Sequence, residues 1–110
     1  MRLGQLSEDF FISGQIEPEH VPKLAEQGFK TIVCNRPDGE DFRQPTAGEI
    51  AAAAEEHGMK FVHIPVPSSG VQRQDFENFK ARYGEFEAPI LAYCRSGARS
   101  AMLFQLYDAE

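Results

Sequence analysis

The order of residues around Cys94 constrains this chain more than any other feature. The apolar run Leu91–Tyr93 leads into Cys94, and a short turn containing Gly97 follows. The next segment, Ala101–Tyr107, has the composition of a helix. A cysteine between a strand and a helix lies where unpaired backbone N–H groups and the positive helix end converge. We therefore expect the Cys94 thiol to have a lowered pKa and its loop to bind an anion or an adduct on sulfur.

The net charge sharpens this expectation. The chain has 110 residues and a formal net charge of −6, which argues against nucleic acid or an anionic membrane surface as a partner. Against that acidic background, Arg95 and Arg99 make a local positive region beside Cys94. The two cysteines, Cys34 and Cys94, form neither a disulfide framework nor a metal cluster. We expect no metal and no cofactor.

The sequence also predicts a location. No apolar stretch approaches the roughly 20 residues that a membrane-spanning helix needs. The start of the chain, Met1–Phe10, lacks the basic residues and the apolar run of a secretory signal. The sequence therefore predicts a cytoplasmic protein.

Strand patterns alternate with helix patterns along the chain. The strands are expected at Phe10–Ile12, Phe29–Cys34, Lys60–Ile64 and Ile90–Tyr93. The helices are expected at Pro18–Gln27, Thr46–His57, Gln72–Tyr83 and Ser100–Asp108. This alternation predicts one α/β domain over residues 1–110, with a central, mostly parallel sheet of about four strands flanked by helices.

Three loops follow the carboxyl ends of the expected strands. They are Asn35–Pro45, Pro65–Val71 and Cys94–Arg99. Ligands bind beyond the carboxyl ends of the strands in such sheets. We therefore expect the three loops to meet at one edge although the sequence separates them.

Cys94 is the predicted nucleophile, and its neighbours are the predicted anion site. Arg99 either binds substrate oxygens or holds the loop through its carbonyl groups, and the substrate role is preferred. Arg95 is expected to help recognise an anionic substrate. Backbone N–H groups are expected from Ser96, Gly97 and Ala98.

Two further residues complete the predicted site. Ser100 is expected to cap the last helix and to hydrogen-bond the Cys94 sulfur. Arg36, on the loop after the second expected strand, is added as a second anion contact. Its neighbour Asp38 is expected to order its turn or to pair with an arginine. Cys34 is expected to be a core thiol, with a role as a resolving cysteine as the alternative.

The spacing of the motif suggests a choice between two chemistries. Cysteine phosphatases place five residues between the cysteine and the arginine, and rhodanese-like sulfurtransferases have a loop one residue tighter. Four residues separate Cys94 from Arg99, and the segment 93–100, Tyr-Cys-Arg-Ser-Gly-Ala-Arg-Ser, resembles the loop of single-domain rhodaneses. The segment 65–70 holds no carboxylate that could serve as a general acid, and Asp75 and Glu77 are the nearest substitutes.

The rest of the chain resembles another family. The segments 11–16, 28–44 (with Asn-Arg-Pro-Asp-Gly-Glu at 35–40) and 58–65 are similar to the phosphatase-like domain of the beta-lactamase-hydrolase-like protein family. This resemblance covers nearly the whole chain. It implies a dual-specificity-phosphatase-type fold carrying a rhodanese-type loop, and a role in sulfide and persulfide metabolism. It also implies an association with a persulfide dioxygenase.

These observations lead to a preferred function and two alternatives. The preferred one is sulfur transfer from thiosulfate or a small persulfide to a thiol acceptor, through a persulfide on Cys94. The first alternative is a cysteine-dependent phosphatase with a phosphorylated Cys94. The second is a non-catalytic partner domain of a persulfide dioxygenase. The expected partners are a small anionic sulfur donor, a thiol acceptor and a persulfide dioxygenase. The last helix ends soon after the loop, so either the fold is minimal or the exposed face packs on a second copy of the chain.

Overall fold

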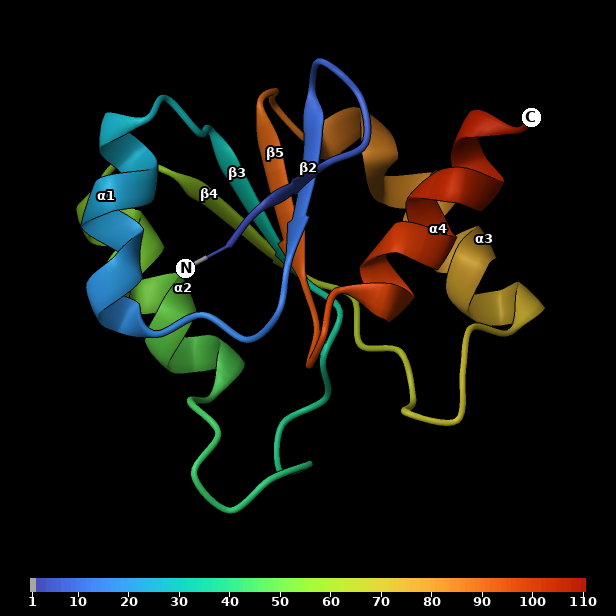
Figure 1. Ribbon diagram of the computed structural model, residues 1–110, viewed down its shortest axis with the longest axis horizontal. Coiled ribbons are helices and arrows are strands. Elements are labelled where there is room, and N and C mark those ends of the chain that lie inside the picture. Colours follow the sequence, from blue (N-terminus) through green and yellow to red (C-terminus); the bar gives the residue numbers. More distant parts are fainter. Residues whose placement is uncertain (1) are drawn as a thin grey trace.

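The computed structural model describes residues 2–110 and has a five-stranded sheet at its centre (Figure 1). The strands are β1 (Gly4–Gln5), β2 (Phe10–Ser13), β3 (Thr31–Cys34), β4 (Lys60–His63) and β5 (Ile90–Tyr93). Their order across the sheet is β1-β2-β5-β3-β4. The four strands from β2 to β4 run parallel, and the short β1 pairs antiparallel with β2.

Helices cover both faces of this sheet (Figure 1). The first layer holds η1 (Pro18–His20), α1 (Val21–Glu26) and α2 (Ala47–Glu56), and the second holds α3 (Arg73–Arg82), η2 (Tyr83–Glu85) and α4 (Ala98–Asp108). No helix within residues 2–110 combines the length and the apolar character that a membrane span requires.

Two apolar clusters fill the space between the sheet and the helices. One cluster lies between the sheet and the layer of α1 and α2, and it joins Leu24 of α1 and Ile50 of α2 to Leu91 of β5. The other joins Phe79 of α3 and Leu103 of α4 to the opposite face. Because both faces are covered, β3 and β5 are buried along their whole length, as is usual for central strands of a parallel sheet.

The predicted fold class is confirmed: the chain has an α/β fold with a mostly parallel sheet between helices. The expected count of about four strands misses β1, whose two residues carry no periodic signal. The expected start of the last helix, Ser100, is wrong because α4 begins at Ala98. Gly97, with φ of 98°, ends the turn in the left-handed region and lets the helix start at once.

The parallel strands bring their following loops to one edge. Arg99, at the start of α4, contacts both other loops: it donates to the backbone oxygen of Val66 and to the carboxylate of Glu40. The expected meeting of the three loops is thus confirmed. The segment after β2 joins them, because the N–H group of Gln15 donates to the backbone oxygen of Arg95.

Candidate active site

The loop from Cys94 to Arg99, here called the Cys94 loop, curls its backbone around one sulfur atom. Cys94 follows β5 directly, and the N–H group of Gly97 donates to its Sγ at 3.1 Å. Gly14 lies close behind this turn: a Cβ on Gly14 would stand 2.9 Å from the backbone oxygen of Arg95. A glycine at position 14 therefore lets the segment after β2 approach the Cys94 loop.

The surroundings of Cys94 favour its thiolate form. Burial is the largest single influence on Cys94, which is 1% exposed, and by itself it would raise the pKa of the thiol. Backbone N–H groups outweigh burial and lower the pKa below its ordinary value; they belong to Ser100, Arg99, Ser96 and Gly97. This confirms the expected direction of the shift and gives a nucleophile close to a set of anion-binding donors.

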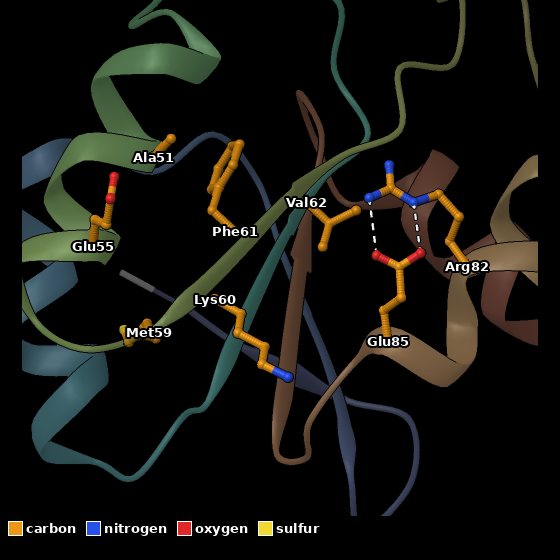
Figure 2. A pocket seen from close by; sticks show the side chains of 8 residues that line it. All are labelled: Ala51, Glu55, Met59, Lys60, Phe61, Val62, Arg82 and Glu85. Atoms are coloured by element: carbon orange, nitrogen blue, oxygen red, sulfur yellow. Dashed lines mark hydrogen bonds and ion pairs between the residues drawn. The ribbon is translucent and has the colours of Figure 1, made fainter.

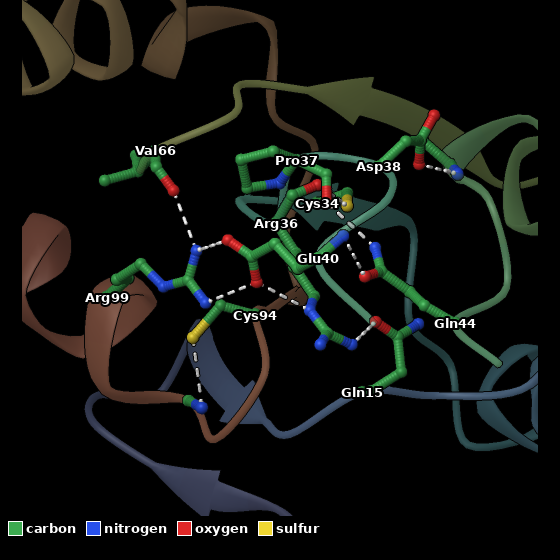
Figure 3. Close-up of polar contacts among 12 residues, drawn as sticks. Gln15, Cys34, Arg36, Pro37, Asp38, Glu40, Gln44, Val66, Cys94 and Arg99 are labelled. Atoms are coloured by element: carbon green, nitrogen blue, oxygen red, sulfur yellow. Dashed lines mark hydrogen bonds and ion pairs between the residues drawn. The ribbon is translucent and has the colours of Figure 1, made fainter. Parts of the chain in front are cut away.

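The Arg99 guanidinium is fixed beside this sulfur (Figure 3). Its Nη1 donates to the backbone oxygen of Val66 at 2.8 Å and to Oε2 of Glu40 at 2.7 Å. Its Nη2 donates to Oε1 of Glu40 at 2.9 Å. A guanidinium has five N–H donors, so within residues 2–110 these three hydrogen bonds leave the Nε–H and one Nη2–H of Arg99 without an oxygen acceptor and available to the Cys94 sulfur. They form one edge of the planar group, and in Figure 3 that edge faces the Cys94 sulfur.

Glu40 sets the orientation of Arg99. Its carboxylate also accepts from Nε of Arg36 at 2.8 Å, so it lies between two guanidinium groups. Hydrogen bonds from Arg99 are the main reason why the pKa of Glu40 falls to about 2, and those from Arg36 add to them. Glu40 is therefore ionised at neutral pH and leaves the free edge of Arg99 for another anion. The sequence alone assigns Glu40 no role, because it stands in a polar loop far along the chain from Arg99.

Arg36 reaches the site through Glu40. The residue is 3% exposed, its Nε holds Glu40, and its Nη1 donates to Oε1 of Gln15 at 3.0 Å. This arrangement makes Arg36 a positioning residue. Contact between its other N–H groups and a bound anion stays a prediction.

The remaining predicted residues fall into two groups. Arg95, Ser96, Ala98 and Arg99 line a hollow of about 390 Å³ over the Cys94 loop. Ser100 is fully buried inside α4, and its hydroxyl donates to Oδ1 of Asn35 at 2.8 Å. The expected cap role of Ser100 is therefore wrong, because the cap position of α4 belongs to Gly97. Substrate contacts by the four residues of the hollow stay predictions.

Cys34 is a core thiol, as expected from its place in the sequence. It is 2% exposed, and its Sγ donates to the backbone oxygen of Arg36 at 3.4 Å. Burial raises the pKa of the Cys34 thiol above its ordinary value, whereas the pKa of Cys94 is lowered. Asp38 orders its loop, as expected, by accepting from the N–H group of Ala47 at 2.8 Å.

A larger hollow, of about 560 Å³, lies elsewhere, against the edge strand β4 (Figure 2). Its lining includes Lys60, Phe61 and Arg82, and Arg82 is already paired with Glu85 at 3.0 Å. No cysteine, serine or histidine lines it among the described residues. The candidate site is therefore the Cys94 loop and not this larger hollow.

A metal site has no support in the side chains. Within residues 2–110, no three His, Cys, Asp or Glu side chains gather where they could hold an ion. That the protein works without a metal or a cofactor stays a prediction.

The sequence of the whole chain matches a family model over residues 2–110, described as "Beta-lactamase hydrolase-like protein, phosphatase-like domain". The chain belongs to this family. A beta-lactamase hydrolase-like protein of Agrobacterium fabrum is 35% identical over 99% of this chain, and one of Xylella fastidiosa is 32% identical over 98%. The chain spans about a quarter of the length of these curated relatives, 25% in each case.

Solved structures agree with this placement. A crystal structure from Neisseria meningitidis named "putative phosphatase" is 39% identical, with a TM-score of 0.85 over 96% of this chain and 75% of that one. The catalytic core of the PP-IP phosphatase Siw14 from S. cerevisiae is 17% identical, with a TM-score of 0.72 over 97% of this chain and 64% of that one. The second likeness is one of fold, and it confirms the cysteine-phosphatase-like architecture.

These comparisons contradict the preferred function from the sequence. The family is phosphatase-like, and the Neisseria relative carries a phosphatase name, so the prediction of a sulfurtransferase is wrong. It rested on one missing residue between Cys94 and Arg99, and that spacing weighed more than the similarity of the remaining chain. The expected partners stay predictions.

Proposed function

We propose that this domain is a cysteine-dependent phosphatase. One observation carries the proposal: the Cys94 sulfur, with its lowered pKa, lies among inward N–H groups and opposite the free edge of Arg99. A nucleophilic sulfur and a ring of donors for oxyanions are what phosphoryl transfer to cysteine requires. The phosphatase name of the Neisseria relative supports the same reaction.

The reaction has two displacements. In the first, the Cys94 thiolate attacks phosphorus, an S–P bond forms, and the bond to the leaving oxygen breaks with its electron pair on that oxygen. The N–H groups of the Cys94 loop and the two free donors of Arg99 bind the phosphoryl oxygens as negative charge builds on them. In the second, water attacks phosphorus and releases inorganic phosphate and the Cys94 thiolate.

The loop departs from the usual phosphatase pattern in length. Four residues, not five, separate Cys94 from Arg99, so the ring of N–H groups is tighter. Arg99 supplies further donors for the phosphoryl oxygens that the tighter ring cannot reach. Glu40 and Val66 hold its guanidinium by three hydrogen bonds and leave one edge of it free. We infer that this edge takes two oxygens of the phosphoryl group side by side.

Hydrolysis of p-nitrophenyl phosphate tests the proposal. Wild-type protein should release nitrophenol, and Cys94→Ser should lose this activity to the background rate. Cys34→Ser is the matched control, since it removes the other buried thiol and should keep the activity. Activity that survives in Cys94→Ser, or that is absent from wild type, would contradict the proposal.

Location and partners belong to the same proposal. A nucleophilic Cys94 must stay a free thiol, which favours a reducing compartment such as the cytoplasm. The curated relatives are about four times longer than this chain, so the domain acts there beside other sequence. Size-exclusion chromatography of the pure protein tests association with a second copy of the chain. The same measurement on a mixture of the protein with a persulfide dioxygenase tests association with that enzyme.

A further inference from the structure

Departure of the leaving oxygen of a phosphate ester is the step that an acid on the protein can assist. The bond between this oxygen and phosphorus breaks on the side opposite the attacking sulfur. A positioned acid that protonates this oxygen contributes about 10²–10⁴-fold in rate. The place for such an acid is the hollow over the Cys94 loop, where the rest of a substrate would lie.

The lining of that hollow holds no acid of suitable strength. Among the described residues that line it there is neither a carboxyl group nor an imidazole. Its polar side chains are the hydroxyls of Ser68 and Ser96 and the guanidiniums of Arg95 and Arg99. Neither serine nor arginine is a residue type that serves as a general acid near neutral pH.

The loop after β4 borders this hollow and also lacks an acid. Its sequence from 64 to 72 contains no Asp, Glu or His. The next carboxylate along the chain, Asp75, accepts from the N–H group of Gln72 at 2.9 Å at the start of α3. Asp75 is thus committed to closing the first turn of a helix.

The loop after β3 carries three acids, and two of them are committed. Glu40 accepts from Arg36 and Arg99 and has no proton to give near neutral pH, because its pKa is about 2. Asp38 accepts from the N–H group of Ala47. The third, Asp41, lines a second hollow, which shares Arg95 with the hollow over the Cys94 loop. Asp41 is not among the residues that line the hollow over the Cys94 loop.

We propose that this site acts on phosphate derivatives whose leaving oxygen is weakly basic and departs without a proton from the protein. Aryl phosphates and phosphoanhydrides have such a leaving oxygen, whereas alkyl phosphates do not. The inference rests on the proposed phosphatase function and narrows its substrate class. Val71, Ala98 and Met102 give the hollow an apolar side that suits an aryl ring, and Arg95 gives it a cation that suits a second phosphate.

A series of leaving groups tests the proposal. The value of kcat/KM is measured for p-nitrophenyl, phenyl and ethyl phosphate, and for inorganic pyrophosphate as the anhydride. In wild type, kcat/KM should fall steadily as the leaving oxygen becomes more basic, from p-nitrophenyl to phenyl to ethyl phosphate. For ethyl phosphate, kcat/KM should lie about 10²–10⁴-fold below the value for an enzyme that supplies a general acid. Preference for phenyl phosphate or for pyrophosphate then assigns the apolar side or Arg95 as the main contact.

Two variants locate any hidden acid. Glu40→Gln should lower kcat/KM by the same factor for every aryl phosphate, because Glu40 acts through Arg99 and not on the leaving oxygen. Asp41→Asn should leave the dependence on leaving-group basicity as it is in wild type. A shallow dependence in wild type that becomes steep in either variant would overturn the proposal and identify that residue as the acid.

The same experiment separates the two claims. If wild type hydrolyses the series in a Cys94-dependent way but with a shallow dependence, the phosphatase function stands and the substrate class is wrong. If no substrate of the series is hydrolysed in a Cys94-dependent way, the phosphatase function is wrong and the inference fails with it.

Discussion

Glu40 and Arg99 are 59 positions apart in the chain and share two hydrogen bonds, at 2.7 and 2.9 Å. Through these bonds the loop after β3 holds the guanidinium of Arg99, which lies in the first turn of α4. Arg36 in turn holds Glu40, because its Nε donates to the Glu40 carboxylate. The pair leaves one edge of Arg99 free toward Cys94 (Figure 3). The anion site is thus built by two loops, and neither loop completes it alone.

The first prediction concerns the pH dependence of stability. The pKa of Glu40 is about 2 in the folded chain, below its ordinary value of 4.5. The ionised carboxylate therefore stabilises the fold above about pH 4.5, and this contribution is lost as the pH falls toward 2. Glu40→Gln should lower the stability at pH 7, by about 1–3 kcal/mol for charged hydrogen bonds lost, and less at acid pH.

Urea denaturation at several pH values measures this effect. Glu49→Gln serves as the control, since Glu49 accepts within an exposed helix cap. An equal loss in Glu40→Gln at pH 7 and at pH 3 would contradict the role given to this carboxylate.

The second prediction concerns the two thiols. N–H groups of the Cys94 loop lower the pKa of Cys94, whereas burial raises that of Cys34, relative to an ordinary value of 9.0. In Cys34→Ala, the ultraviolet absorbance of the thiolate should therefore appear below pH 9. In Cys94→Ser, it should appear above pH 9 or only on unfolding. Titration in the reverse order would show that the N–H groups do not stabilise the Cys94 thiolate.

The third prediction uses two glycines with nearly the same φ angle. Gly97 has φ of 98° and Gly28 has φ of 96°, so alanine at either position costs about 1–2 kcal/mol of folding stability. A Cβ at Gly28 meets nothing within 4 Å, whereas one at Gly97 stands 3.4 Å from the backbone oxygen of Ser13. Both variants should have similarly lowered Tm, but only Gly97→Ala should lose phosphatase activity. Full activity in Gly97→Ala would mean that the exact turn of the Cys94 loop does not matter.

The fourth prediction concerns a buried polar link. The hydroxyl of Ser100 donates to Oδ1 of Asn35, whose Nδ2 donates to the backbone oxygen of Ile64 at 3.0 Å. Ser100→Ala leaves a buried oxygen unpaired and should cost about 1–3 kcal/mol of folding stability. Ser96→Ala, in the Cys94 loop, is the control: its exposed hydroxyl accepts only from the N–H group of Ala98, at 3.3 Å, so its loss should cost less stability. Equal thermal unfolding of both variants would remove Ser100 from the account.

Much of the fold could be predicted because its signals are local. Three of the four residues of β3 are β-branched, and Thr46 and Glu49 form the helix cap that the sequence predicts. A parallel sheet then places its loops at one edge, which was enough to predict that the loops after β3 and β4 meet the Cys94 loop. The short strand β1 was missed because two residues have no periodicity.

The missing parts of the site depend on distant partners. Glu40 stands in a polar loop, where an acid is usually a solvated side chain, and nothing local shows that it pairs with Arg99. Ser100 follows a turn and has the composition of a cap, but Gly97 takes that position. The predicted activity was wrong for another reason. The resemblance to rhodaneses rests on eight residues around Cys94, whereas the similarity to the phosphatase-like family covers nearly the whole chain.

Detection of a phosphorylated Cys94 is the most direct test of the proposed phosphatase. Wild type mixed with p-nitrophenyl phosphate and quenched in acid within one turnover should gain the mass of one phosphoryl group. Peptide mapping should place it on Cys94, and Cys34→Ser should gain the same mass. Turnover without any phosphorylated Cys94, or a phosphoryl group on another residue, would contradict the mechanism.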